Sequence, residues 1–229
     1  MSILNKRLLM AANMLKKGKA VADIGTDHAF LPIHIIKEQI ADRVLACDIA
    51  EGPLSVASAN VQKYKLEDKI ELRLADGLKG IKPFECEQIT ICGMGGETIA
   101  GIITEAEWVK SPKVSLVLQP MSCDDRLREF LVLNNFEIEQ EKAVISQGRV
   151  YTVMRVVYSK EPQKKDIAFK YIGKLLDTPD EAAIMFVLRR LKSMRSCMND
   201  IKSVERKKDL FNELLTATEI IEQKIKRAN

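Results

Sequence analysis

The 229-residue sequence predicts an α/β fold in which a mostly parallel sheet is followed by a helical hairpin. Between residues 19 and 134, short apolar runs alternate with segments of helical periodicity, which is typical of parallel strands covered by helices on both faces. Two longer apolar runs follow with only Gln147-Gly148-Arg149 between them, and so short a connection forces an antiparallel pair. Beyond residue 159, apolar residues recur only at helical spacing. We therefore expect a Rossmann-like, seven-stranded, mostly parallel sheet with an antiparallel terminal strand, plus a C-terminal α-helical coiled-coil hairpin.

The first element is a helix over residues 5–17, where Leu4, Leu8, Ala11 and Leu15 recur at helical spacing. Gly18 then stands where a glycine commonly ends a helix. The seven strands are expected at residues 19–24, 43–49, 69–74, 88–92, 114–118, 136–146 and 150–158. The helices between the parallel strands are expected at residues 31–39, 52–64, 97–105 and 124–134.

The C-terminal region begins with a polar segment, 160–165, that has the composition of a linker. Thr178 is expected as a helix N-cap, with Pro179 in the first turn and Glu181 completing a capping box. Apolar residues then recur at alternating spacings of three and four, with a break over residues 205–209. Two antiparallel helices joined near 203–209 are the simplest geometry, and one long helix with a stutter is the alternative. The predicted domains are residues 1–159 and a helical appendage, 160–229.

The positive charge of the chain is concentrated in this C-terminal region. Residues 160–229 hold 16 Lys and Arg against 11 Asp and Glu, a net of +5, whereas the whole chain carries +4. A polyanionic partner or a solvated helix face would each produce this excess. No apolar run approaches the length of a membrane span, and residues 2–10 lack the apolar block of a signal peptide. The five cysteines show no CxxC spacing, so we expect reduced thiols, a cytoplasmic protein and no metal site.

Polar and glycine residues follow four of the predicted parallel strands. Because the carboxyl ends of parallel strands meet at one edge of a sheet, these groups are expected to share a ligand groove. The first strand end supplies Asp23, Gly25, Asp27 and His28, the second Asp48 and Ile49, the third Asp76 and Gly77, and the fourth Gly93, Met94, Gly95 and Gly96. Taken singly, Gly25 is explained by a tight turn and Asp27 by a helix cap. Their combination at matched strand ends favours a ligand site.

The residue types at these ends indicate a nucleoside. Asp48 is placed to accept hydrogen bonds from both ribose hydroxyls, and Asp76 could accept from an adenine amino group. A dinucleotide site would need a G-x-G-x-x-G turn, of which only Gly25 is present. The carboxylates would repel a pyrophosphate, but they suit a cofactor with a cationic end, such as the amino group and sulfonium of S-adenosylmethionine.

Five segments carry a resemblance to a known family. They are Ala22-Asp23-Ile24-Gly25-Thr26-Asp27-His28-Ala29-Phe30-Leu31-Pro32, Ala46-Cys47-Asp48-Ile49, Leu74-Ala75-Asp76-Gly77-Leu78, Ile91-Cys92-Gly93-Met94-Gly95-Gly96 and Leu118-Gln119-Pro120-Met121. With them the sequence resembles the class I S-adenosylmethionine-dependent methyltransferases, and more closely the bacterial tRNA (adenine-22-N1)-methyltransferases. The resemblance covers essentially the whole chain, including the helical appendage. It implies S-adenosylmethionine as cofactor, tRNA as partner, and cofactor contacts at Gly25, Asp27, His28, Asp48, Asp76, Gly77 and Gly93.

The fourth strand end also bears on the reaction. Enzymes of this class that methylate exocyclic amino groups usually carry Asp/Asn-Pro-Pro followed by an aromatic residue there, whereas this chain has Gly93-Met94-Gly95-Gly96. The departure agrees with attack by a ring nitrogen. Adenine N1 has an available lone pair, so positioning matters more than a base. If a base acts, Asp27 or His28 is the candidate, and Asp23 is expected to order the amino-acid end of the cofactor.

The substrate contacts are expected elsewhere. A stacked adenine must be turned outward to reach the groove, where Gln119 is either a neighbour of the base or a strand-end cap. Arg189, Arg190 and Lys192 are expected to contact RNA phosphates. The alternatives are a methyltransferase of the same fold acting on another substrate, and a non-catalytic RNA-binding protein. No membrane or metal partner is expected, and the oligomeric state is left open, a monomer included.

Overall fold

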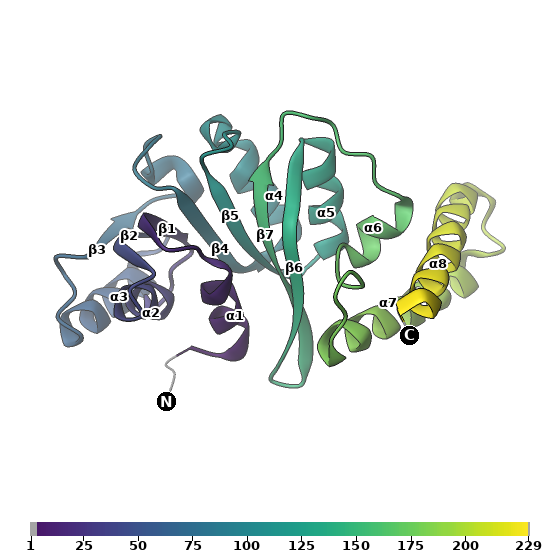
Figure 1. The fold of residues 1–229 in the computed structure, drawn as a ribbon, viewed down its shortest axis with the longest axis horizontal. Coiled ribbons are helices and arrows are strands. Elements are labelled where there is room, and N and C mark those ends of the chain that lie inside the picture. Colours follow the sequence, from purple (N-terminus) through teal and green to yellow (C-terminus); the bar gives the residue numbers. More distant parts are fainter. Residues whose placement is uncertain (1–3, 229) are drawn as a thin grey trace.

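A single seven-stranded sheet organises the computed structural model, which describes residues 4–228 (Figure 1). Its strands lie in the order β3-β2-β1-β4-β5-β7-β6. β7, the last strand in the sequence, runs antiparallel to both of its neighbours, and the other strands are parallel to one another, as predicted. The strands are β1 (Gly18–Ile24), β2 (Ala41–Asp48), β3 (Ile70–Leu74), β4 (Gln88–Gly95), β5 (Ser115–Ser122), β6 (Phe136–Ser146) and β7 (Arg149–Tyr158).

Helices cover both faces of the sheet because alternate strand residues are apolar on both sides. Ala22 and Leu45 lie in a core that α4 and α5 cover, whereas Val21 and Val44 lie in the core beneath α2 and α3. The helices of this part of the chain are α1 (Lys6–Met14), α2 (Phe30–Lys37), α3 (Glu51–Lys63), α4 (Gly96–Thr104) and α5 (Asp124–Leu133). Burial on both faces is the reason that the parallel strands read as nearly continuous apolar runs.

Several predicted element boundaries are wrong, among them the end of the fifth strand, which lies at Ser122 rather than at residue 118, and sheet pairing explains two others. Gly18 does not end a helix: α1 ends at Met14, and Gly18 is the first residue of β1, where its N–H donates to the carbonyl of Ile40 at 3.0 Å. The fourth strand does not stop at Cys92 but continues to Gly95 beside β5, with irregular register around Met94. In both places backbone pairing with a neighbouring strand overrides the tendency of glycine to end a helix or a strand.

Between residues 160 and 228 the structure has three α-helices: α6 (Ile167–Ile172), α7 (Glu181–Ile201) and α8 (Lys208–Ala228). α6 was not predicted. α7 and α8 form a hairpin whose turn spans the predicted residues, and Arg195 pairs with Glu222 across it at 2.6 Å, so the single long helix is excluded. The expected N-cap is wrong, because the side chain of Asp180 rather than Thr178 accepts the N–H of Ala183, at 2.8 Å.

α7 lies against β6 at the edge of the sheet, α6 packs on α5, and α8 packs on α6 and α7 farther from the sheet (Figure 1). A fully buried Arg128 on α5 donates to Glu141 of β6 and Asp124 of α5, at 2.7 Å each, and to the carbonyls of Lys170 and Tyr171 in α6. These contacts link the two predicted domains, 1–159 and 160–229. The division of the chain at residue 159 therefore stays a prediction. No helix in the part of the chain that the structure describes is both long and apolar enough to span a membrane.

Candidate functional site

A cavity of about 480 Å³ lies where the carboxyl ends of β1, β2, β3 and β4 meet. Its lining includes most of the residues that the sequence pointed to: Asp23, Gly25, Asp27, His28, Asp48, Ile49, Asp76, Gly77, Gly93 and Met94. Gly95, Gln119, Arg189, Arg190 and Lys192 do not line it. The prediction that the strand ends share one groove is therefore confirmed, while the role of each residue stays a prediction.

The turn between β1 and α2 is held in a shape that needs glycine. Gly25 has φ +74, and the N–H groups of Gly25 and Thr26 both donate to the Cys47 carbonyl at 2.9 Å. A Cβ at Gly25 would lie 2.2 Å from the methyl group of Met94. The turn therefore brings bare backbone to the cavity wall, where a ligand can approach closely.

Asp48 ties this turn to β2. One carboxylate oxygen accepts the N–H of Asp27 and the other accepts the N–H of Ala50, each at 3.0 Å. Each oxygen keeps a further lone pair, so the carboxylate can also accept two hydroxyl donors from a vicinal diol. Ile49 beside it exposes 69% of its surface and offers an apolar wall for a planar ring.

Asp76 and Gly77 close the other side of the cavity. Asp76 pairs with Lys79 at 2.6 Å while more than half of its side chain remains exposed. Gly77 has φ +56, and a Cβ there would lie 3.3 Å from Ile102. The Asp76 carboxylate thus keeps acceptor capacity toward the cavity, but shares it with a lysine.

Asp23 is the buried acid of the site. It is 3% exposed, and the Thr90 hydroxyl donates to it at 2.6 Å. Removal from water raises the pKa of the Asp23 carboxyl to about 6, offset in part by the Thr90 hydrogen bond and increased by the negative charge of Asp48. A positive charge placed in the cavity would stabilise the ionised form.

Asp27 and His28 stand at the mouth of the cavity. Asp27 adopts φ +53 and exposes 68% of its side chain, and His28 Nδ1 lies 3.5 Å from one of its carboxylate oxygens. The Asn60 amide donates to the His28 carbonyl at 3.0 Å, and the imidazole meets Phe30 edge to face. Both side chains are free to meet a second molecule, which is compatible with the expected role near a target base.

Gln119 lies beneath the cavity and is completely buried. Its amide oxygen accepts from the Gly93 N–H at 3.1 Å and from the Arg7 guanidinium, while its amide nitrogen donates to the Pro120 carbonyl. These contacts support an indirect role, in which Gln119 fixes Gly93 and Arg7, and its contact with a substrate stays a prediction.

Arg7 is the functional residue that the sequence reasoning missed. Among the described residues that line the cavity, it is the only one with a permanent positive charge. Its guanidinium lies 3.4 Å from where a Cβ of Gly93 (φ +82) would be. The helical spacing could have identified it. Arg7 lies four residues before Ala11 and seven before Met14, both of which are buried, so it is a cation on the buried face of α1.

The lining fits S-adenosylmethionine on the chemistry of its donors and acceptors. Asp48 can take the ribose hydroxyls, Asp23 and Asp27 can face the cationic amino group and sulfonium, and Arg7 can face the carboxylate. Glycine backbone at positions 25 and 93 leaves room that side chains would fill. Within residues 4–228, no group of three or more His, Cys, Asp or Glu side chains is placed to hold a metal ion.

The three basic residues predicted to contact RNA lie on α7, away from the cavity. Arg189 and Lys192 are exposed and form no ion pair with the described residues. Arg190 instead pairs with Asp124 at 2.5 Å and lies over the Phe186 ring at 5.3 Å. Part of its charge is therefore committed to holding α7 against α5.

Comparison with known proteins gives consistent results. A family model described as "Methyltransferase domain" matches residues 4–154. The chain is 36% identical over 151 residues to the tRNA (adenine(22)-N(1))-methyltransferase of Bacillus subtilis (strain 168), a match that covers 66% of this chain and 63% of that protein. The aligned region thus spans less than two thirds of that relative's length.

Solved structures match over nearly the full chain. The crystal structure of the B. subtilis m1A22 tRNA methyltransferase TrmK superposes with a TM-score of 0.86 at 28% identity, covering 98% of this chain and 100% of that one. The structure of M. capricolum TrmK in complex with S-adenosyl-homocysteine has a TM-score of 0.80 at 25% identity, covering 96% of this chain and 99% of that one.

Proposed function

Since the chain belongs to the methyltransferase domain family, a class I S-adenosylmethionine-dependent family whose model matches residues 4–154, we propose that it methylates N1 of adenine 22 in tRNA. The observation that carries the proposal is the cavity at the carboxyl edge of the sheet, where Asp23, Asp48 and Arg7 are brought together. The similarity over the full length to tRNA methyltransferase structures, C-terminal helices included, supports the choice of substrate.

S-adenosylmethionine supplies a methyl group made electrophilic by the sulfonium. The residues of this chain bind and orient the reactants. Asp48 fixes the ribose, Arg7 holds the carboxylate of the amino-acid end, and Asp23 faces its cationic groups. Because adenine N1 has an available lone pair, holding the base in line contributes more than proton abstraction. We assign Asp27 and His28 to the region of the target base, where the amino group next to N1 becomes more acidic after transfer.

The proposal is tested by incubating the protein with unmodified tRNA transcript and methyl-labelled S-adenosylmethionine, followed by mapping of the modified base. We expect N1-methyladenine at position 22, and no label in a transcript with guanine there. Binding of S-adenosylhomocysteine without any transfer to tRNA would favour a methyltransferase of the same fold with another substrate. Absence of cofactor binding would favour the non-catalytic RNA-binding alternative.

The cofactor affinity should depend on pH through Asp23. The pKa of this carboxyl is about 6 in the free protein, and a cationic ligand lowers it by favouring the carboxylate. Binding below pH 6 must therefore release a proton, so the affinity for S-adenosylhomocysteine, which keeps the cationic amino group, rises about tenfold from pH 5 to pH 7 and then levels off. Calorimetry in buffers of different ionisation enthalpy counts the released proton. D23N should abolish the dependence, and a slope that persists in D23N would assign it to another group.

We propose that residues 160–229 contact tRNA through the exposed cations of α7. The double variant R189A/K192A should lower tRNA affinity several-fold and reduce the slope of log K against log salt by about 2, because two phosphate contacts are lost. Arg190 is kept because its pairing with Asp124 is structural. K63A on α3 is the matched control. Cofactor affinity should be unchanged in both variants, and equal tRNA affinity in R189A/K192A and K63A would remove α7 from the RNA interface.

A further inference from the structure

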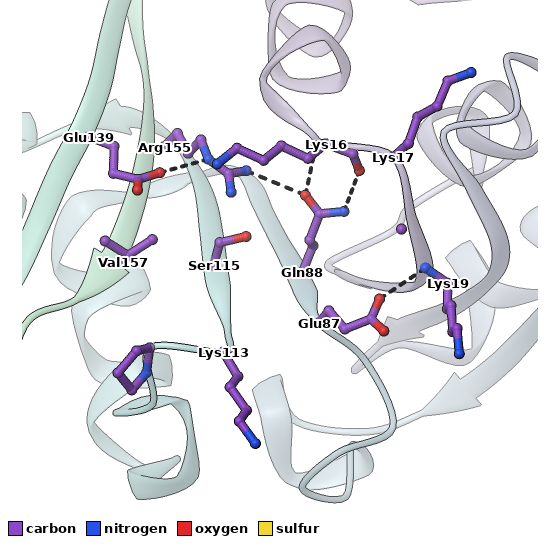
Figure 2. Close-up of a pocket in the computed structure, with 12 residues that line it drawn as sticks. Lys16, Lys17, Lys19, Glu87, Gln88, Lys113, Ser115, Glu139, Arg155 and Val157 are labelled. Atoms are coloured by element: carbon purple, nitrogen blue, oxygen red, sulfur yellow. Dashed lines mark hydrogen bonds and ion pairs between the residues drawn. The ribbon is translucent and has the colours of Figure 1, made fainter.

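A second cavity lies at the opposite edge of the sheet, where β1, β4 and β5 begin (Figure 2). Its volume is about 390 Å³, and its lining contains five cationic side chains and two carboxylates. We call it the basal cavity and define it by Lys16, Gln88, Ser115 and Arg155, with Lys17, Lys19 and Lys113 at its rim. None of these groups takes part in the proposed methyl transfer.

The floor of the basal cavity is built from buried polar groups. Arg155 is 7% exposed and donates through Nε to Glu139 at 2.9 Å and through Nη1 to the Met14 carbonyl at 3.1 Å. Its Nη2 donors make no hydrogen bond to the described residues. Ser115 beside it is 5% exposed, and its hydroxyl is buried without a hydrogen-bond partner. A buried hydroxyl left without a partner destabilises the protein, so a ligand that accepts a hydrogen bond from it would be stabilised there.

The wall of the basal cavity is held in place by Gln88. Its side chain accepts the N–H of Lys16 at 2.8 Å and donates to the Lys16 carbonyl at 2.6 Å. Figure 2 shows the Lys16 side chain extending from this clamped backbone toward Arg155, whereas the rim lysines point outward. Lys16 and the three rim lysines are exposed and form no ion pair with the described residues. The local charge is therefore positive and uncompensated.

The two carboxylates offset only part of this charge, because five cations against two carboxylates leave a net of +3. Glu139 pairs with Arg155, and Glu87 accepts the backbone N–H groups of Lys19 and Ala20 at 2.9 and 3.4 Å. Both carboxylates thus have hydrogen-bond donors within the protein, and Lys16, Arg155 and Ser115, which keep unused donors, line the same cavity. We propose that the basal cavity binds a phosphate group, with Arg155 and Ser115 at its base and Lys16 closing over it.

The phosphate has two possible sources, the backbone of the bound RNA or a free phosphorylated molecule. The RNA source rests on the proposed function and is supported by α1, which supplies Arg7 to the cofactor cavity at one end and leads into Lys16 at the other. At a helical rise of 1.5 Å per residue, Arg7 and Met14 are about 10 Å apart, and two further residues lead to Lys16, so both cavities lie well within the length of a folded tRNA.

The direct test is a titration of the full chain with inorganic phosphate, followed by amide chemical shifts. We expect saturable shifts at Gly18 and Ser115, and an increase in Kd of about tenfold in the double variant K16A/S115A, because a charge-assisted and a neutral hydrogen bond are lost. K69A is the control. Lys69 is exposed and directly precedes β3 at the same edge of the sheet, so this variant should bind phosphate like the wild type. Absence of saturable shifts, or an unchanged Kd in K16A/S115A, would overturn the proposal.

A second measurement distinguishes the sources. Reduced tRNA affinity in K16A/S115A, with unchanged S-adenosylhomocysteine affinity, would assign the phosphate to RNA; unchanged tRNA affinity with weakened phosphate binding would assign it to a free phosphorylated molecule. The phosphate titration uses neither cofactor nor tRNA, so it tests phosphate binding in the basal cavity even if the methyl-transfer assay fails. Circular dichroism of K16A/S115A establishes that the variant is folded.

Discussion

Replacing Arg128 by methionine is expected to lower the free energy of unfolding by about 3–5 kcal/mol, because it leaves buried carboxylates without their partner. The guanidinium is completely buried and holds Glu141, whose side chain is also completely buried, at 2.7 Å. It also holds Asp124 and two backbone carbonyls of α6. Urea denaturation followed by circular dichroism measures the loss.

The matched control is R126M on the same helix. Arg126 exposes 60% of its side chain and pairs with Glu129 only at 3.5 Å, so its loss should change the stability by no more than about 0.5 kcal/mol. R128M/E141M should recover part of the stability, because Asp124 retains Arg190. If R128M and R126M unfold at the same urea concentration, the buried network does not stabilise the fold.

The same network sets how the C-terminal region is attached. Gly173 follows α6 with φ +52, and a Cβ there would lie 1.8 Å from a Glu141 carboxylate oxygen. Arg128, Glu141 and Gly173 thus form one close-packed junction between α5, β6 and α6. In R128M we also expect faster proteolysis within residues 160–180, since the junction that holds this segment is weakened.

Replacing Asp48 by alanine is expected to weaken S-adenosylhomocysteine binding about 10- to 100-fold, because a carboxylate accepting ribose hydroxyls contributes about 1.5–3 kcal/mol. The variant also loses the hydrogen bonds from Asp27 and Ala50, so the turn that lines the cavity is loosened. D48N keeps one acceptor oxygen and should lie between alanine and wild type. Calorimetric titration gives each Kd.

E51Q is the control for this prediction. Glu51 is exposed in the first turn of α3, three residues from Asp48, and does not line the cavity. Its removal should leave the Kd within about twofold of wild type. A D48A protein that also binds within twofold would refute the ribose assignment.

The fold followed from the sequence wherever burial and periodicity agree. The parallel strands are apolar on both faces, so their positions were readable, and the short connection at Gly148 identified the antiparallel pair. α6 was missed because it has only six residues, too few for a periodic pattern. Its stability comes from tertiary contacts of Ala168 and Ile172 rather than from its own helical preference.

The site was predictable to the extent that it depends on strand ends. Asp23, Asp48 and Gly77 meet because parallel strands finish at one edge, which the order of elements already implies. The places of Arg7 and Gln119 depend on how α1 packs across the sheet, which no local pattern specifies. For the same reason the pairing of Arg190 with Asp124 could not be predicted. Arg190 was expected to contact RNA, but it forms an ion pair that holds α7 against α5.

The strand order has a consequence for how the chain is assembled as it is made. β7 lies between β5 and β6, so β6 has no place in the sheet until β7 has been synthesised. At a synthesis rate of roughly 5–20 residues per second, β6 waits about a second for its partner. During that interval its apolar residues, Phe136 and Ile138 among them, have no strand to pair with. β6 can therefore join the sheet only together with β7 or after it, and α7 can cover β6 only afterwards. The edge formed by β6 is thus the last part of the sheet to be protected from other nascent chains.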